Sequence, residues 1–177
     1  MQVVDAVEKW YSVMVNPYGF YSTINAEERG QKNGLVFFVL VTLVARVPTF
    51  YEGNANMFKF AVLTAVLLLV SPALLHIITG IQYLALWLVT DEDRGVDRTL
   101  RAVAYSTAPA VVAWIPGVGI VALYGVYLQY VGIREGHKIG RVRAAVAVAV
   151  PAVLLYSVGY LGYENARFVL RVGRELL

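Results

Sequence analysis

The sequence predicts an all-α, polytopic membrane protein, a bundle of five transmembrane helices with an amphipathic helix at each end. Composition is the first reason: of 177 residues, 59% are hydrophobic and 15% are charged, and the mean hydropathy is +0.63. Polar side chains are too few to cover a soluble domain of this size, so lipid must cover much of the surface. The apolar residues also fall in long runs, and the basic residues concentrate between these runs.

A tight membrane hairpin is predicted from two adjacent apolar runs, Leu100–Ile115 and Gly117–Ile133, joined by a Pro-Gly turn. A helix needs roughly 17–25 apolar residues to cross a bilayer, and both runs approach the lower limit. Pro109 has no N–H to donate, so we expect a kink there, with Ser106 or Thr107 satisfying the freed backbone groups.

The remaining spans are predicted at Gly34–Tyr51, Phe58–Val89 and Val142–Tyr163. Phe58–Val89 would form a helix of about 48 Å, longer than a hydrocarbon core of about 30 Å. It is either one tilted or kinked span, or two short spans broken at Pro72. One span leaves ten of the 15 Lys and Arg residues in the cytoplasm and five outside, whereas two spans give a weaker six against nine. The positive-inside rule therefore favours five spans in the cell membrane, with the N-terminus cytoplasmic and the C-terminus outside.

Two amphipathic segments flank the transmembrane domain at residues 34–163. Residues 1–33 form a cytoplasmic segment that opens with a helix over Gln2–Val15, which lies along the membrane surface or packs on the spans. Its apolar stripe comprises Val3, Val7, Trp10 and Met14. The sequence NPYGFY then breaks the helix, because proline disfavours the α conformation of the residue before it. Residues 164–177 predict a short amphipathic helix on the outer surface.

Catalytic, cofactor-binding and metal sites are not expected. The chain has no cysteine and two histidines, and it lacks phosphate-loop, zinc-protease and serine-hydrolase motifs. The net charge of +3 lies mainly between the apolar runs, a pattern that suits anionic lipid headgroups and not nucleic acid. The candidate headgroup- or partner-binding residues lie in one basic loop: Arg134, Lys138, Arg141 and Arg143.

Polar residues inside the predicted spans form a second candidate site. Buried polar groups cost several kcal/mol unless they are paired or face water, so they mark either a polar cavity or hydrogen bonds between helices. We favour hydrogen bonds, because the span interiors hold no carboxylate of the kind that ion carriers commonly use. The candidate cluster comprises His76, Thr79, Gln82, Tyr83, Tyr105, Tyr127 and Gln129.

Several motifs together resemble the Yip family of Rab-GTPase-interacting membrane proteins, particularly its short prokaryotic members. They are NPYGFY before the first span, RAVAYSTAP in the third, a WIPGVG turn, and GIREGHKIGRVRA before a last span that contains proline. The resemblance covers nearly the whole chain and is carried by the order and spacing of Tyr105, Ser106, Pro109, Pro116, Gly136 and Pro151.

The resemblance implies a cytoplasmic N-terminus, five spans and no enzymatic activity. Eukaryotic members are implicated in vesicle trafficking, membrane shaping and binding of prenylated small GTPases. This chain lacks their long acidic and proline-rich extension and has NPYGF where they carry a DLYGP-type motif, which argues against a GTPase partner.

The expected function is therefore to organise or shape membrane, or to scaffold a partner there. The expected partners are the bilayer and a second copy or another membrane protein. The alternative is a small transporter or channel with a polar cavity around His76, Tyr83 and Gln129.

Overall fold

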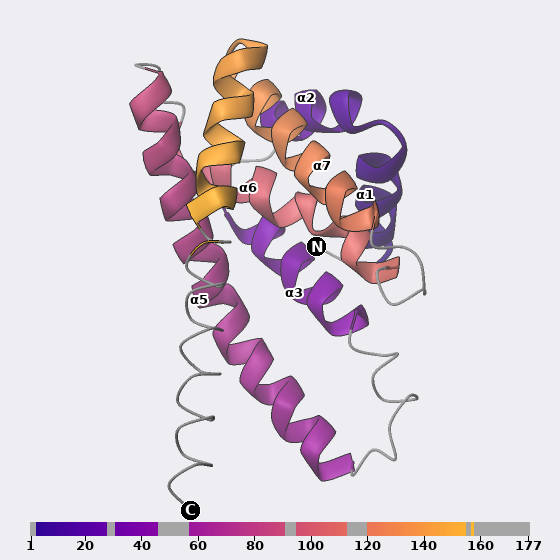
Figure 1. The fold of residues 1–177 in the computed structure, drawn as a ribbon. Helices are drawn as coiled ribbons and strands as arrows, with labels where there is room; N and C mark the ends of the chain where they lie inside the picture. Colours follow the sequence, from indigo (N-terminus) through magenta and orange to yellow (C-terminus); the bar gives the residue numbers. More distant parts are fainter. Residues whose placement is uncertain are drawn as a thin grey trace, which may run out of the picture.

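The computed structural model describes residues 3–27, 31–45, 57–90, 95–112, 120–154 and 157. Within these ranges the chain is helical apart from short turns, as predicted, and no strand is present. The labelled helices in Figure 1 are α1 (Val3–Val15), α2 (Pro17–Glu27), α3 (Lys32–Val44), α5 (Met57–Val89), α6 (Val96–Ser106), the 3₁₀ helix η1 (Ala108–Val112) and α7 (Ile120–His137). Residues 141–154 form a further helix after α7.

Helix α6 lies at the centre of the bundle, with α3, α5 and α7 packed around it (Figure 1). Every residue from Thr99 to Tyr105 is buried. Small side chains permit this close packing: a Cβ at Gly132 of α7 would lie 2.9 Å from the Cβ of Ala102, and one at Gly34 of α3 would lie 3.5 Å from that of Ala104. The short helix α6 therefore serves as the core against which longer helices pack.

Helix α5 is one continuous helix through Pro72, so of the two alternatives for Phe58–Val89 the structure has the single long segment. At 33 residues it is about 50 Å long. Residues 57–70 include no buried side chain among those described, and this half runs away from the other labelled helices in Figure 1. From Ser71 onward a buried face appears at helical spacing: Ser71, Leu75, Thr79, Gln82 and Leu86. The second half of α5 thus packs on the bundle, while the first half exposes apolar side chains all round.

The predicted span Leu100–Ile115 differs from the structure, because α6 ends at Ser106 and η1 follows after one turn residue. The physical reason is the missing N–H of Pro109, which lies within η1. Both hydroxyl side chains donate to carbonyls of the last turn of α6: Ser106 to Val103 O at 2.7 Å and Thr107 to Ala104 O at 2.6 Å. At 11 residues α6 alone is about 17 Å long, so a span here has to include η1 to cross a hydrocarbon core.

Within the described ranges, one helix is long and apolar enough to cross a membrane, Phe60–Val89, and 11% of its most apolar window is buried. Lys32–Val44 is apolar but shorter. The prediction of five spans therefore rests on the sequence, and the predicted amphipathic helix over residues 164–177 lies outside the described residues.

The N-terminal region folds into two helices where only one was predicted. The predicted helix over Gln2–Val15 is present as α1, but the break that follows lasts for Asn16 alone. Proline is well suited to the first position of a helix, and Asn is a strong N-cap. Pro17 accordingly begins α2, and the Asn16 Oδ1 accepts the Gly19 N–H at 3.1 Å.

An aromatic cluster joins α2, α3 and α6. The Tyr105 ring packs edge-on against Phe20, with centroids 4.9 Å apart, and lies 4.7 Å from Phe37. Tyr21 is fully buried beside Phe20, and burial raises the pKa of its phenol well above the usual range. The phenol therefore stays protonated and donates to Ala102 O at 3.4 Å. The cluster fixes the N-terminal helices to the centre of the bundle.

Candidate functional site

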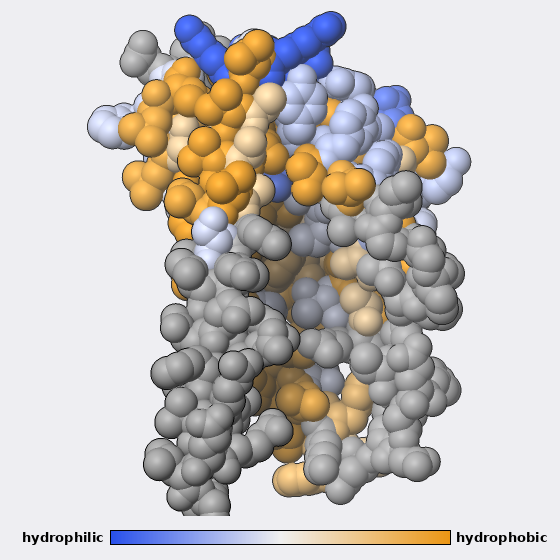
Figure 2. Space-filling model, in the orientation of Figure 1, coloured by the Kyte–Doolittle hydropathy of each residue, from blue (hydrophilic) through white to orange (hydrophobic). Residues whose placement is uncertain are grey.

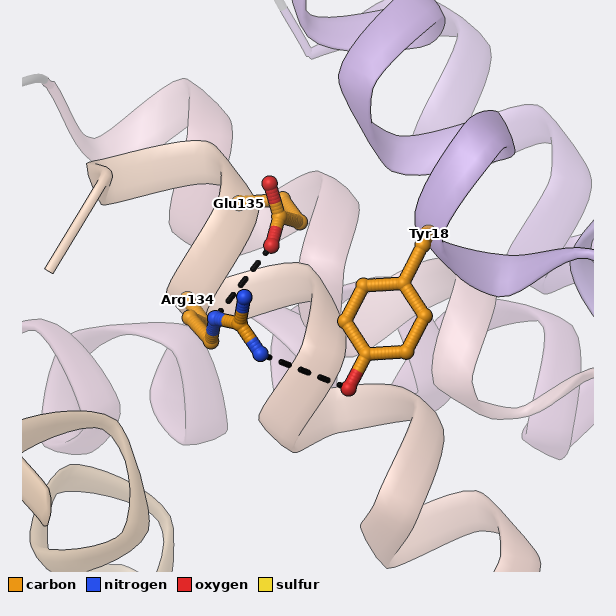
Figure 3. A network of polar contacts seen from close by, with 3 residues as sticks. All are labelled: Tyr18, Arg134 and Glu135. Atoms are coloured by element: carbon orange, nitrogen blue, oxygen red, sulfur yellow. Dashed lines mark hydrogen bonds and ion pairs between the residues drawn. The ribbon is translucent and has the colours of Figure 1, made fainter. Parts of the chain in front are cut away.

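The predicted basic residues Arg134, Lys138, Arg141 and Arg143 lie where α7 ends and the next helix begins, and we call them the basic end. Arg134 reaches toward α2, where Nη1 donates to the Tyr18 hydroxyl at 3.4 Å and Cζ lies 5.2 Å from the centroid of the Tyr18 ring (Figure 3). Nε lies 3.3 Å from Glu135 Oε1. Arg134 is thus held in place by α2 and by its own helix.

The other three cations of the basic end are exposed. Lys138 has a φ of 51°, the left-handed conformation that usually belongs to glycine at the end of a helix. Arg141 and Arg143 lie in the first turn of the helix over residues 141–154, which starts after Gly140. Cations repel the positive end of a helix dipole, so this arrangement favours an anion nearby. In Figure 2 hydrophilic residues mark the top of the molecule, above largely apolar surface.

Two contacts between α6 and α7 hold the basic end against the bundle. Arg98 Nη1 donates to the Gly136 carbonyl at 2.9 Å, which satisfies a free carbonyl in the last turn of α7. The buried His137 Nε2 is hydrogen bonded to Thr99 Oγ1 at 3.0 Å. These two contacts from α6 therefore hold the turn that carries the exposed cations.

A buried arginine links the same region to α2. Arg101 is 3% exposed, and its Nη2 donates to the Asn25 Oδ1 at 3.2 Å. Asn25 Nδ2 in turn donates to the Tyr21 carbonyl at 2.7 Å. Sequence reasoning assigned no role to Arg98, Thr99, Arg101 or Asn25, and the only available signal was two arginines three residues apart beside an apolar run.

The predicted intramembrane cluster does not form one site. His76 is exposed on α5, where Nδ1 donates to Pro72 O at 2.7 Å and Nε2 lies 3.3 Å from Gln31 Oε1. Tyr105 belongs to the aromatic cluster, and Tyr127 is partly exposed on α7, 5.7 Å from Tyr124 between ring centroids.

Gln82 and Gln129 are the two predicted residues that the structure brings into hydrogen-bond contact. The buried Gln82 accepts from Gln129 Nε2 at 2.9 Å and donates through its own Nε2 to the Ala147 carbonyl. This chain of contacts ties α5, α7 and the helix over residues 141–154 together. Tyr83, the next residue after Gln82, is half-buried. The Thr79 hydroxyl is buried and has no hydrogen-bond partner among the described residues.

Two cavities are described, and neither is lined by a described member of the predicted intramembrane cluster. One, of about 500 Å³, lies between α1 and α2 and has mixed polar and apolar walls that include Glu8, Ser12 and Thr23. The other lies between α1 and α3 and is apolar. Of the polar groups on α5 and α7, Gln82 and Gln129 serve as contacts between helices in the described part of the chain.

An all-helical bundle with a 33-residue apolar helix, largely uncovered, and a cationic end has the features of an integral membrane protein. Its family follows from sequence comparison: residues 11–162 match the model of the Yip1 domain, which covers most of the chain. The protein belongs to the Yip1 domain family, as the motifs indicated. No curated protein and no solved structure matches the chain.

Proposed function

We propose that this Yip1 domain protein organises or shapes the membrane without catalysing a reaction, by holding an apolar helix surface and a cationic end against the cytoplasmic leaflet. It crosses the bilayer five times, with its N-terminus in the cytoplasm and its C-terminus outside. Its partners are anionic headgroups and a second copy or another membrane protein.

The arrangement of α1 carries this proposal. One side of α1 is fixed to the bundle, since the Trp10 indole N–H donates to Ala108 O at 2.9 Å and the Tyr124 hydroxyl donates to Met14 O at 2.6 Å. The other side exposes an apolar row that we call the outer stripe: Val4 (65% exposed), Val7 (59%), Tyr11 (62%) and Val15 (63%). An apolar row on a fixed helix suits insertion into the boundary between headgroups and acyl chains.

The exposed apolar row of α1 differs in part from the apolar stripe predicted from the sequence, Val3, Val7, Trp10 and Met14. Trp10 and Met14 pack against the core, whereas Val7 remains exposed. A helix with apolar residues on two adjacent faces both binds its own protein and presents a surface to lipid. Apolar groups inserted into one leaflet expand it relative to the other, which is a physical route to curvature.

Replacement of the outer stripe tests this function. Val4→Ser with Tyr11→Ser removes apolar surface from the outer stripe and leaves Trp10 and Met14, which pack against the core, unchanged. In liposomes containing anionic lipid, the double variant should tubulate membranes less and lose preference for small vesicles. Glu8→Gln with Ser12→Ala, on the polar side of α1, is the matched control and should behave as the wild type. Equal tubulation by both variants would contradict the proposal.

Neutralising the exposed cations Lys138, Arg141 and Arg143 tests the proposed contact between the basic end and anionic headgroups. Each cation near an anionic surface contributes about 1 kcal/mol of binding, and salt screens this contribution. The triple glutamine variant should therefore bind anionic liposomes more weakly at low salt and like the wild type at high salt. If the same variant instead loses a protein that co-purifies with the wild type, the basic end scaffolds a partner.

A further inference from the structure

An apolar groove lies between α1 and α3 and is closed at one side by η1. Its volume is about 230 Å³. Every described residue of its lining is apolar: Ala6, Val7, Trp10, Phe37, Leu40, Val41, Val44 and Val111. Trp10 brings no free polar atom to the groove, because its indole N–H is bonded to Ala108 O.

Hydrocarbon is the chemistry that fits this lining. Water needs two to four polar partners in a cavity, and the described walls offer no polar side chain. An apolar cavity of about 150 Å³ stays dry and takes up benzene. A larger apolar groove left empty would forfeit dispersion contacts along its walls.

The mouth of the groove indicates where the hydrocarbon comes from. Val7 is 59% exposed and belongs both to the groove and to the outer stripe, and Val44 at the end of α3 is 47% exposed. The groove is thus continuous with the surface that we assign to the leaflet, and its second wall is an apolar helix of a membrane domain. A hydrocarbon chain at this depth belongs to a lipid.

We propose that the groove binds one acyl chain of a bilayer phospholipid and so ties α1 to the leaflet. The inference rests on the proposed placement of α1 at the membrane. The phospholipid inserts its chain between α1 and α3 past Val7 and Val44, and its headgroup stays outside. The groove would then act as a lipid-anchoring site, and the outer stripe beside it would lie at the depth of the first methylenes.

Trp10 is a natural probe for this site. The chain has three tryptophans, so Trp87→Phe with Trp114→Phe leaves Trp10 as the single tryptophan, which is excited selectively over tyrosine. The protein is titrated in detergent micelles with a phosphatidylcholine brominated along its acyl chain, because bromine quenches indole fluorescence at contact. Bound lipid is counted on the same samples by native mass spectrometry. We expect saturable quenching and one retained phospholipid per chain.

Val111→Phe fills the groove from η1. Val4→Phe is the matched control, because Val4 lies on the outer stripe but does not line the groove. Val111→Phe should lose the quenching and the retained lipid, and Val4→Phe should keep both. Circular dichroism checks folding, and if Val111→Phe is unfolded, Val44→Phe at the mouth makes the same test. Quenching that does not saturate, or that is equal in the filled and control variants, overturns the proposal.

The micelle measurement is independent of membrane shape. If Trp10 is quenched but the protein does not tubulate liposomes, the proposed function is contradicted and the assignment of the groove stands. If the protein tubulates liposomes but Trp10 is not quenched and no lipid is retained, the assignment of the groove alone is contradicted.

Discussion

Two helical glycines give opposite predictions for the same substitution. An added Cβ at Gly132 would lie 2.8 Å from Cε1 and Cζ of Tyr21 and 2.9 Å from the Cβ of Ala102, all three atoms buried between helices. At Gly80, in α5, a Cβ would meet no atom within 4 Å. Alanine at Gly132 therefore forces α7 away from α2 and α6, whereas alanine at Gly80 only improves the helix.

The magnitudes follow from two opposing effects. Overpacking a core costs about 1–3 kcal/mol, while alanine in place of glycine in a helix gains about 1 kcal/mol. The contacts at Gly132 involve an aromatic ring fixed by its neighbours, so the cost lies in the upper half of that range. Gly132→Ala should then lower the free energy of unfolding by about 1–2 kcal/mol, and Gly80→Ala should raise it by up to about 1 kcal/mol.

Thermal unfolding in detergent, followed by circular dichroism, measures the pair. One kcal/mol corresponds to about 2–4 °C for a chain of this length. Gly132→Ala should melt a few degrees below the wild type and Gly80→Ala at or above it. A Gly132→Ala variant that melts with or above Gly80→Ala would refute the close packing of α7 on α2 and α6.

Three further substitutions test contacts of the described residues by the same unfolding assay. Gln82→Leu should lower the free energy of unfolding by about 1–2 kcal/mol, because it breaks the contacts to Gln129 and Ala147. The double variant Gln82→Leu with Gln129→Leu should lose less stability than the sum of the two single variants, and strict additivity would contradict the contact. Lys138→Gly should stabilise by about 1 kcal/mol by relieving the positive φ, whereas Lys138→Ala should not; equal effects would exclude backbone strain. Arg101→Met should lower the free energy of unfolding by about 2 kcal/mol, because it leaves the Asn25 oxygen without its arginine donor. Lys32→Met, at an exposed position, is the control and should change this free energy by no more than about 0.5 kcal/mol. Similar effects of the two variants would contradict the buried contact.

Helical periodicity and hydropathy predicted the elements whose character is local. The helix α1 follows from its side-chain pattern. The missing N–H of Pro109 marked the irregularity after α6, although a kink and not a helix end was predicted there. For Phe58–Val89, the distribution of basic residues favoured the single long segment that α5 forms. The family could also be predicted, because its motifs lie in order along the chain.

Elements that depend on tertiary packing were not predicted. In α2, Pro17 was interpreted as a helix breaker, although it occupies the one helical position where proline is favourable. In α6 the start, Val96–Thr99, lies before the predicted span Leu100–Ile115, yet it is helical because Thr99 and Arg98 find partners on α7. The contact of Arg101 with Asn25 joins residues 76 positions apart, and no pattern in one sequence encodes the register that brings them together.

The placement of α5 in lipid is the central claim, and the absence of cysteine from the chain makes it directly measurable. Leu69 is 80% exposed in the structure, so a cysteine there would react rapidly with a water-soluble maleimide if water surrounded it. In intact membrane vesicles Leu69→Cys should stay unlabelled until the protein is denatured, whereas Lys138→Cys should be labelled in inside-out vesicles. Rapid labelling of Leu69→Cys without detergent would show that water, not lipid, surrounds this helix.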